Sequence, residues 1–159
     1  MENAFSIRRF RPEDREAMVR ITIECFDGVS IDQNIERRFG KLGETTWQER
    51  KAAQVESEIH LEPRGIFVAE ADGQVVGFVT TRLLPRYRTG CIANIAVSKG
   101  FQGRGIGKAL IDRALAYFRE QGLEFARIET LDQNETGKYL YPKLGFQEIA
   151  RQIYYVKRL

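Results

Sequence analysis

The chain has 159 residues, of which 43% are hydrophobic and 30% charged, and these proportions are typical of one compact globular domain spanning residues 1–159. Two cysteines are too few for a disulfide scaffold, and a single histidine excludes a His-rich metal site and disfavours Ser-His or Cys-His hydrolases. No stretch is long and apolar enough to span a membrane and the N-terminus has no signal-peptide pattern, so we expect a cytoplasmic protein with no membrane partner.

The basic residues are concentrated in the second half of the chain. Residues 1–72 carry 11 basic and 15 acidic side chains, whereas residues 73–159 carry 14 basic and 7 acidic ones, and no acidic residue stands between Asp72 and Asp112. This distribution favours a phosphate-rich ligand, although a solvated basic face would give the same count. We expect no nucleic-acid partner, because the net charge is only +3 and the basic stretch lacks interleaved aromatic residues for base stacking.

The N-terminal part is predicted to hold one strand and three helices. Residues 4–10 have a strand-like pattern, and a proline followed by two acidic residues then opens a helix over residues 12–26. Apolar residues at helical spacing predict a second helix over residues 31–39. The sequence Thr46-Trp47-Gln48-Glu49 is a capping box, so a third helix is expected to begin near Trp47.

A β-hairpin and a further strand are predicted next. Residues 66–71 and 75–83 flank Asp72-Gly73, a two-residue turn signal, so these strands are expected to be antiparallel. After Gly90, alternating apolar residues predict a strand that ends at Val97. Cys91 lies in this strand with no evident base beside it, so we interpret it as a buried residue rather than a nucleophile.

The second half of the chain alternates helices with strands. Residues 106–118 carry apolar side chains at helical spacing, residues 124–131 are strand-like, and residues 134–144 return to helical spacing. Residues 146–159 are strand-like with no turn signal inside. A helix between two strands makes those strands parallel neighbours, and ligands gather at the carboxyl ends of such strands. We therefore predict an α/β fold (α+β mixed).

Three glycines stand between the predicted strand end and the following helix: Gly103, Gly105 and Gly107. Glycines at a helix N-terminus leave backbone N–H groups uncovered, which favours an anion. A Walker A loop fails here because it requires glycine at position 102 and serine or threonine at position 109. A dinucleotide-binding fingerprint fails because position 108 is lysine and the motif comes too late in the chain. A tight turn without a ligand is the remaining alternative.

The pattern that fits is Gln/Arg-x-x-Gly-x-Gly, met by Gln102-Gly103-Arg104-Gly105-Ile106-Gly107 behind the strand end Ile95-Ala96-Val97. This resembles the GNAT superfamily of N-acetyltransferases, and within it the ribosomal-protein alanine N-acetyltransferases. The segment from Asn134 through Tyr141-Pro142-Lys143-Leu144-Gly145-Phe146 is similar to the second signature of that family. The resemblance covers almost the whole chain. It implies a central mixed sheet with N-terminal hairpin strands, splayed parallel strands at the coenzyme A (CoA) site, and flanking helices.

The resemblance also implies a co-substrate and a set of binding residues. The loop would bind the pyrophosphate of acetyl-CoA, without a metal, and a bulge in the preceding strand would present backbone N–H groups to the thioester carbonyl. The residues expected to bind acetyl-CoA are Ile95, Ala96, Val97, Gln102, Gly103, Arg104, Gly105, Ile106, Gly107, Lys108 and Asn134. Asn134 would contact the pantetheine arm, and it would also suit a helix N-cap. The implied reaction is direct transfer of the acetyl group to a primary amine of a small molecule or protein.

Two side chains match catalytic positions of the family. Tyr141 would protonate the departing thiolate, or it is a core aromatic on the face of Leu140 and Leu144. Glu129 would be the general base, or it is a surface residue paired with Arg127. The rival function from another class is a non-catalytic acyl-CoA sensor in which both side chains are structural.

Two features depart from the family pattern. Pro142 lies inside the last predicted helix and removes a backbone donor, which would shift the pose of Tyr141. The segment 146–159 is short for the two final strands common in the family, so we expect one long strand or exchange of this strand with a second chain in a homodimer. By analogy with the family, residues 26–31 and Tyr154-Tyr155 would line the acceptor mouth.

Overall fold

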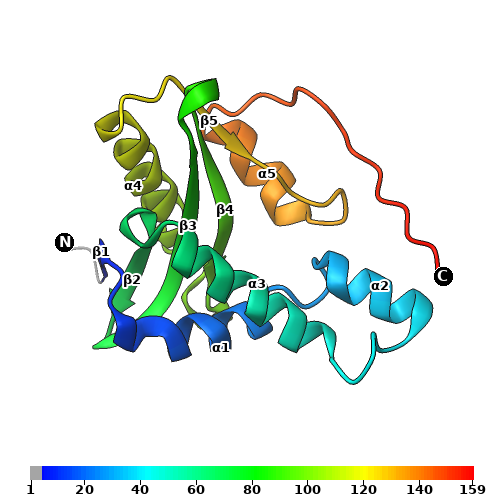
Figure 1. The fold of residues 1–159 in the computed structure, drawn as a ribbon. Helices are drawn as coiled ribbons and strands as arrows, with labels where there is room; N and C mark the ends of the chain where they lie inside the picture. The colour runs from blue at the N-terminus through cyan, green and yellow to red at the C-terminus, as the bar shows by residue number, and fades with distance from the viewer. Residues whose placement is uncertain (1–4) are drawn as a thin grey trace.

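A computed structural model describes residues 5–159 as a single sheet with helices on both faces (Figure 1). The strands are β1 (Ser6–Arg9), β2 (Phe67–Ala71), β3 (Gln74–Leu84), β4 (Thr89–Val97) and β5 (Phe125–Ile128), in that order across the sheet. The first four strands pair antiparallel, whereas β4 and β5 are parallel. This arrangement confirms the predicted mixed sheet and its parallel pair.

The predicted helices are present. The α-helices are α1 (Arg15–Cys25), α2 (Ile31–Phe39), α3 (Trp47–Leu61), α4 (Ile106–Glu120) and α5 (Glu135–Lys143). Short 3-10 turns are η1 (Pro12–Asp14), η2 (Pro63–Gly65), η3 (Pro85–Tyr87) and η4 (Lys99–Phe101). The capping box before α3 is formed in full, with Glu49 N–H donating to Thr46 Oγ1 and the Thr46 backbone N–H donating to the Glu49 carboxylate.

Each face of the sheet has its own core. On one face, α4 buries Leu110, Ile111 and Ala114 against Phe67 and Val79 of the sheet. On the other face, α1 and α3 bury a second cluster: Met18, Ile21, Val55, Ile59, Ile66, Val68, Val75, Phe78 and Ala96. The sheet is therefore covered on both sides.

The hairpin between β2 and β3 follows from its turn residues. Asp72 and Gly73 have φ values of 51° and 73°, so both central residues are left-handed, as a type I′ turn requires. Ala71 and Gln74 pair directly across the turn. Part of the first predicted strand, residue 4, lies outside the described residues.

The strand predicted near the C-terminus is absent from the described chain, and its exchange with a second chain stays a prediction. Residues 146–159 contain no strand, and β5 is shorter than the predicted segment 124–131. The physical reason is that strand propensity is realised only when a neighbouring strand pairs with the backbone, and residues 146–159 lie beside none in the described chain. No helix within residues 5–159 is long and apolar enough to cross a membrane.

Candidate functional site

β4 carries a β-bulge at its middle, and the resemblance implies a bulge in this strand. The register between β3 and β4 shifts by one residue there and leaves Ala93 unpaired. Pairing between β4 and β5 stops at Ile92 and Ile128, but β4 continues to Val97. Within the described chain, the last part of β4 therefore has β3 along one edge and no strand along the other (Figure 1).

The register decides which backbone groups face that open edge. Ser98 N–H donates to the Val76 carbonyl at 2.8 Å, which makes these opposed residues a hydrogen-bonded pair. Bonded and non-bonded pairs alternate along an antiparallel ladder, so Ala96 also faces β3. Ile95 and Val97 belong to the non-bonded pairs. Their N–H and C=O groups therefore point to the open edge, where β4 and β5 have separated.

The glycine turn, residues 98–108, follows β4 directly and includes the first residues of α4. Gly103 and Gly105 have φ values of 77° and 82°, in the left-handed region that favours glycine. A Cβ atom at either residue would meet no atom within 4 Å. The backbone N–H groups of residues 103–108 donate no hydrogen bond to any described residue. They lie at the N-terminus of a 15-residue helix, where uncovered donors and the helix dipole both attract an anion.

The side chains of the turn are held close to it. Gln102 Nε2 donates to the Val97 carbonyl at 2.9 Å and ties the turn to the end of β4. The Arg104 guanidinium donates to a carbonyl within the turn at 3.1 Å. Lys108, one helical turn further on, pairs with Asp112 at 2.5 Å. All three side chains are exposed, so the two cations can exchange these contacts for phosphate oxygens.

Sequence reasoning missed the support that α1 gives to this turn. Glu24 accepts hydrogen bonds from the Lys99 backbone N–H and from Ser98 Oγ, both at 2.7 Å, and the Lys99 bond lowers the pKa of the Glu24 carboxyl. Cys25 Sγ donates to the Val97 carbonyl at 3.2 Å, and burial raises the pKa of this thiol to about 11. No sequence pattern marks Glu24, because its partners lie more than 70 residues away.

The structure also shows the surroundings of Cys91 and Asn134. Cys91 is buried in β4, as predicted. Asn134 Oδ1 accepts from the Gly137 N–H at 3.2 Å, and Asn134 Nδ2 donates to Thr130 Oγ1 at 2.8 Å, so Asn134 caps α5. A Cβ atom at Gly107 would lie 3.9 Å from Leu140 of α5. Thus α5 packs beside the start of α4.

Tyr141 lies on α5, directly after Leu140. It is half-buried, its ring packs edge-on against Phe146 with the centroids 6.3 Å apart, and burial raises the pKa of its phenol. A Cβ atom at Gly137 would approach the Tyr141 ring to 2.9 Å, so glycine makes room for it. The helix runs through Pro142 to Lys143 rather than stopping at the proline. The core contacts expected of an aromatic residue are present, and the phenol has no hydrogen-bond partner among the described residues.

Glu129 follows the last residue of β5 and is exposed. Its Oε1 lies 3.2 Å from Arg127 Nε, and both side chains are more than half exposed. The surface ion pair considered as the alternative to catalysis is therefore present in the structure.

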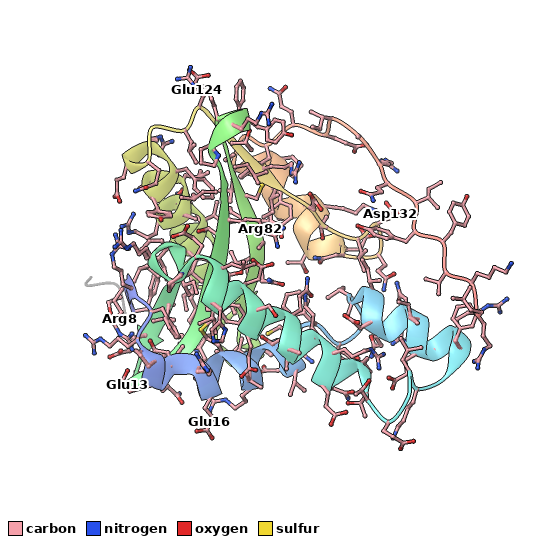
Figure 2. All side chains as sticks on the ribbon, viewed as in Figure 1. Arg8, Glu13, Glu16, Arg82, Glu124 and Asp132 are labelled. Atoms are coloured by element: carbon pink, nitrogen blue, oxygen red, sulfur yellow. The ribbon has the colours of Figure 1, made fainter. Side chains whose placement is uncertain are left out.

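Two buried charges on α3 were also missed. Lys51 Nζ donates to Asn94 Oδ1 beside the bulge at 2.8 Å and lies 4.1 Å from the centroid of the Phe26 ring, and burial lowers the pKa of Lys51 to about 8. Glu58 pairs with Arg82, which is labelled in Figure 2, but Glu58 Oε2 has no hydrogen-bond partner among the described residues. Their spacing along α3, seven residues with buried Val55 between them, was the available signal for an inward-facing polar pair.

Comparison with known proteins places these features in one family. Residues 28–146 match the model of the acetyltransferase (GNAT) family. A mycothiol acetyltransferase of Rhodococcus jostii is 29% identical over 119 residues, which cover 70% of this chain and 39% of the relative. A mycothiol acetyltransferase of Streptomyces avermitilis is 34% identical over 107 residues, which cover 67% of this chain and 33% of the relative. The chain thus spans less than half the length of these curated relatives.

Solved structures share the fold along most of the chain. Ard1 from Thermoplasma volcanium has a TM-score of 0.66 and 27% identity, covering 92% of this chain and 85% of that one. The PaiA N-acetyltransferase of Thermoplasma acidophilum, solved in complex with coenzyme A, has a TM-score of 0.70 and 20% identity, covering 90% and 89%. The ribosomal-protein subtype stays a prediction.

Proposed function

The chain belongs to the acetyltransferase (GNAT) family, and on that premise we propose that it transfers the acetyl group of acetyl-CoA to a primary amine. The observation that carries the proposal is the meeting of two sets of uncommitted backbone N–H groups. One set lies on the open edge of β4, at Ile95 and Val97, and the other on residues 103–108 of the glycine turn. A thioester joined to a pyrophosphate is a ligand that uses both sets.

We place the pyrophosphate on the glycine turn, where Arg104 and Lys108 add positive charge. The pantetheine arm then runs along the open edge of β4, with Asn134 at its side. This fits the space that the structure leaves, because no atom lies within 4 Å of a Cβ at Gly103 or Gly105. Gln102 keeps the turn in register with the strand through its bond to Val97.

In the proposed reaction the nitrogen lone pair of a neutral amine attacks the thioester carbonyl carbon and the C–S bond breaks. The N–H groups of Ile95 and Val97 stabilise the developing oxyanion. Tyr141 donates its phenol proton to the leaving sulfur and regains a proton as the amine nitrogen loses one. Burial supports this role, because it raises the pKa of Tyr141 and keeps the phenol protonated at neutral pH.

We assign removal of the proton from the acceptor ammonium to Glu129, acting through water. The carboxylate is exposed at the end of β5, so an incoming cationic amine can replace its Arg127 partner. The acceptor would enter beside the loops that follow α1 and β5. These loops touch, since Gln133 Nε2 donates to the Gly28 carbonyl at 2.6 Å and to Asn34 Oδ1 at 3.1 Å.

The test is thiol release from acetyl-CoA in the presence of a panel of primary amines, together with calorimetric titration of CoA. We expect CoA to bind and at least one amine to raise thiol release in proportion to its own acetylation. Failure of CoA to bind would overturn the proposal. Tight CoA binding with no active amine would favour the acyl-CoA sensor, a function to which the surface ion pair of Glu129 lends support.

A further inference from the structure

The acid-free stretch of residues 73–111 holds a cation that the proposed pyrophosphate site does not use, Arg82 on β3. Two residues before it, Thr80 pairs with Asn94 of β4, whose side chain accepts a hydrogen bond from Lys51 of α3. Alternate residues of a strand share a face, so Arg82 lies on the face of the sheet that α3 covers. Figure 2 shows Arg82 in the space between β4 and α5.

Arg82 is held in place by a buried carboxylate. One oxygen of Glu58 pairs with the guanidinium, and the Glu58 side chain is 4% exposed whereas the Arg82 side chain is 50% exposed. Within residues 5–159, Arg82 makes no other hydrogen bond and Glu58 Oε2 has no partner. An arginine that only neutralises a carboxylate gains most from two parallel hydrogen bonds. Most donors of Arg82 are instead free to bind a second anion from the solvent side.

A second cation of the same face lacks a counter-ion. Lys51 is 8% exposed, and its ammonium donates at 2.8 Å to the neutral amides of Gln54 and Asn94. It forms no ion pair in the described part of the chain, and burial lowers its pKa to about 8, so it remains charged at neutral pH. Buried charges in proteins are normally paired. Here one buried carboxylate, Glu58, serves two cations.

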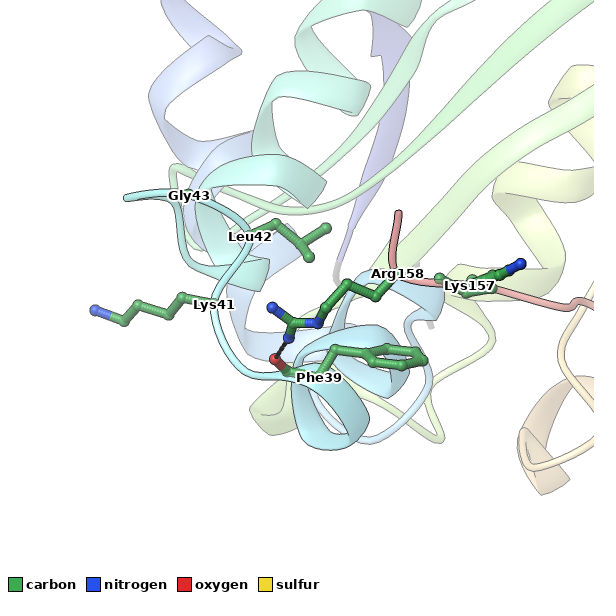
Figure 3. A pocket seen from close by; sticks show the side chains of 7 residues that line it. Phe39, Lys41, Leu42, Gly43, Lys157 and Arg158 are labelled. Atoms are coloured by element: carbon green, nitrogen blue, oxygen red, sulfur yellow. Dashed lines mark hydrogen bonds between the residues drawn. The ribbon is translucent and has the colours of Figure 1, made fainter.

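Another group of cations lines a shallow groove of about 250 Å³ between residues 39–43 and 156–158 (Figure 3). These cations are all exposed: Lys41, Lys157 and Arg158. Water already solvates exposed cations, so they gain little from an added counter-ion. The buried, unbalanced charge is at Lys51 and Arg82 instead.

We propose that Arg82 anchors an anionic group, a carboxylate or a phosphate, carried by the acceptor amine, and that the charge of Lys51 reinforces this anchor. The proposal rests on the acetyl transfer proposed above and names the class of acceptor. The planar guanidinium fork fits two oxygens of either group. The bound anion balances the excess positive charge around Glu58.

The register of β4 sets how far this anion lies from the reacting nitrogen. Arg82 pairs with Cys91, and the proposed oxyanion donor Ile95 is four residues further along β4, with Ala93 unpaired at the bulge between them. At about 3.3 Å per residue, and with one residue taken up by the bulge, the separation is about 10 Å. Three residues of an extended peptide span about the same distance. The acceptor is therefore an amine with its anionic group about three peptide units away, rather than a free α-amino acid.

The first experiment compares kcat/KM for triglycine, triglycine amide and glycine with acetyl-CoA. We expect triglycine to exceed both others by about tenfold or more, chiefly through a lower KM, because only its carboxylate reaches Arg82. Comparing 6-aminohexyl phosphate with 6-aminohexanol repeats the test for a phosphate, and the pair with the larger ratio identifies the anion. Ratios near one in both pairs would overturn the proposal.

The second experiment repeats the comparison with variants. Arg82→Gln keeps a hydrogen-bond donor for Glu58 and removes the anchoring charge, so the ratio of triglycine to triglycine amide should fall below about threefold with CoA affinity unchanged. Arg88→Gln is the matched control, since Arg88 pairs with Glu124 and is 63% exposed, and it should keep the wild-type ratio. Thermal unfolding reports whether each variant is folded. A wild-type ratio in Arg82→Gln would contradict the anchor.

Lys51→Met tests the reinforcing charge. It should lower the same ratio by a smaller factor than Arg82→Gln, because Lys51 acts on the anion through its field rather than by contact. An unchanged ratio would remove Lys51 from the anchor.

Binding measurements separate this proposal from the catalytic one, because they require no reaction. Triglycine and triglycine amide are titrated calorimetrically into the protein with and without CoA. Tighter binding of triglycine that is lost in Arg82→Gln, with no amine acetylated, would support the anchor and contradict acetyl transfer. Acetylation without any preference for an anionic acceptor would support acetyl transfer and contradict the anchor.

Discussion

The two sides of the candidate site differ in whether backbone groups or side chains are the candidate functional groups. On the β4 side, the groups that we assign to the ligand are backbone N–H groups, and buried packing holds them in place: Ile106 and Leu110 just behind the turn are 1% and 0% exposed. On the β5 side, the candidate groups are the side chains of Glu129 and Tyr141, carried by a four-residue edge strand and a short helix.

The difference indicates how each side tolerates change. Backbone donors are fixed by the fold, so only a substitution that alters backbone conformation or fills the space can remove them. Side chains on an edge strand can be replaced at little cost in stability. The following substitutions test this division.

The largest effect is expected at the glycine turn. Gly105→Ala should weaken CoA binding by roughly tenfold or more, which is about 1.4 kcal/mol, because the new Cβ enters the space assigned to phosphate. The substitution also strains a residue whose φ is 82°. Calorimetric titration of CoA measures the first effect, and thermal unfolding measures the second.

Gly122→Ala is the matched control at the other end of α4. Its φ is 72° and its Cβ would also meet no atom within 4 Å. Both variants should lose about 1 kcal/mol of stability from left-handed strain. Only Gly105→Ala should lose affinity. Equal affinities in the two variants would contradict the assignment of the turn to the CoA phosphates.

Tyr141→Phe should lower kcat by roughly tenfold or more and leave CoA affinity nearly unchanged, since the ring keeps its packing and only the proton donor is lost. Burial raises the pKa of Tyr141, and a general acid works in its protonated form. Wild-type turnover should therefore show an alkaline limb that falls as pH rises through that raised pKa, and this limb should be missing in the variant.

Tyr139→Phe controls for the loss of a phenol from α5. Tyr139 is 66% exposed and contacts Lys143. Its substitution should change kcat by less than about twofold, as is usual for surface positions. A similar kcat in the two variants would leave Tyr141 as a core aromatic residue.

Glu129→Gln tests the β5 side more narrowly. If Glu129 is the base, kcat/KM should fall by about tenfold at neutral pH, at the lower end of what general bases contribute. Arg127→Gln removes the other half of the surface ion pair and should change kcat/KM by less than about twofold. Equal, small effects in both variants would show that the pair is only structural.

The fold was predictable where local signals agree with tertiary packing. Asp72-Gly73 predicted the hairpin because only a turn with two left-handed residues joins such strands tightly. The apolar stripe of α4 predicted its buried face for the same kind of reason. The strand predicted over residues 146–159 is absent from the described chain, because a strand needs a neighbouring strand to pair with. A single sequence does not reveal whether that neighbour is in the same chain.

In the candidate site, too, the residues marked by a local sequence pattern were predictable, whereas those that depend on tertiary packing were not. The glycine turn was predictable because its glycines and the start of α4 are consecutive in the sequence. Glu24, Lys51 and Glu58 were not, because each acquires its role from residues brought close by packing of α1 and α3 against the sheet. Ile95 and Val97 were predicted together with Ala96, and only the register of β4 separates them.

The smallest effect is expected from Glu24, which supports the turn through its bonds to Ser98 and Lys99. Glu24→Gln should lower the free energy of unfolding by about 1 kcal/mol at pH 7, because a charged acceptor of two hydrogen bonds is lost, and should weaken CoA binding by a few-fold. The pKa of Glu24 is lowered by the Lys99 bond from its ordinary value of 4.5, so the contribution is complete above pH 4.5 and is lost as the pH falls through the lowered pKa. The difference between wild type and variant should therefore shrink at acid pH in chemical denaturation. Glu16→Gln, an exposed position on the same helix, should show neither effect. A difference that persists at low pH would mean that the carboxylate charge does not hold the turn.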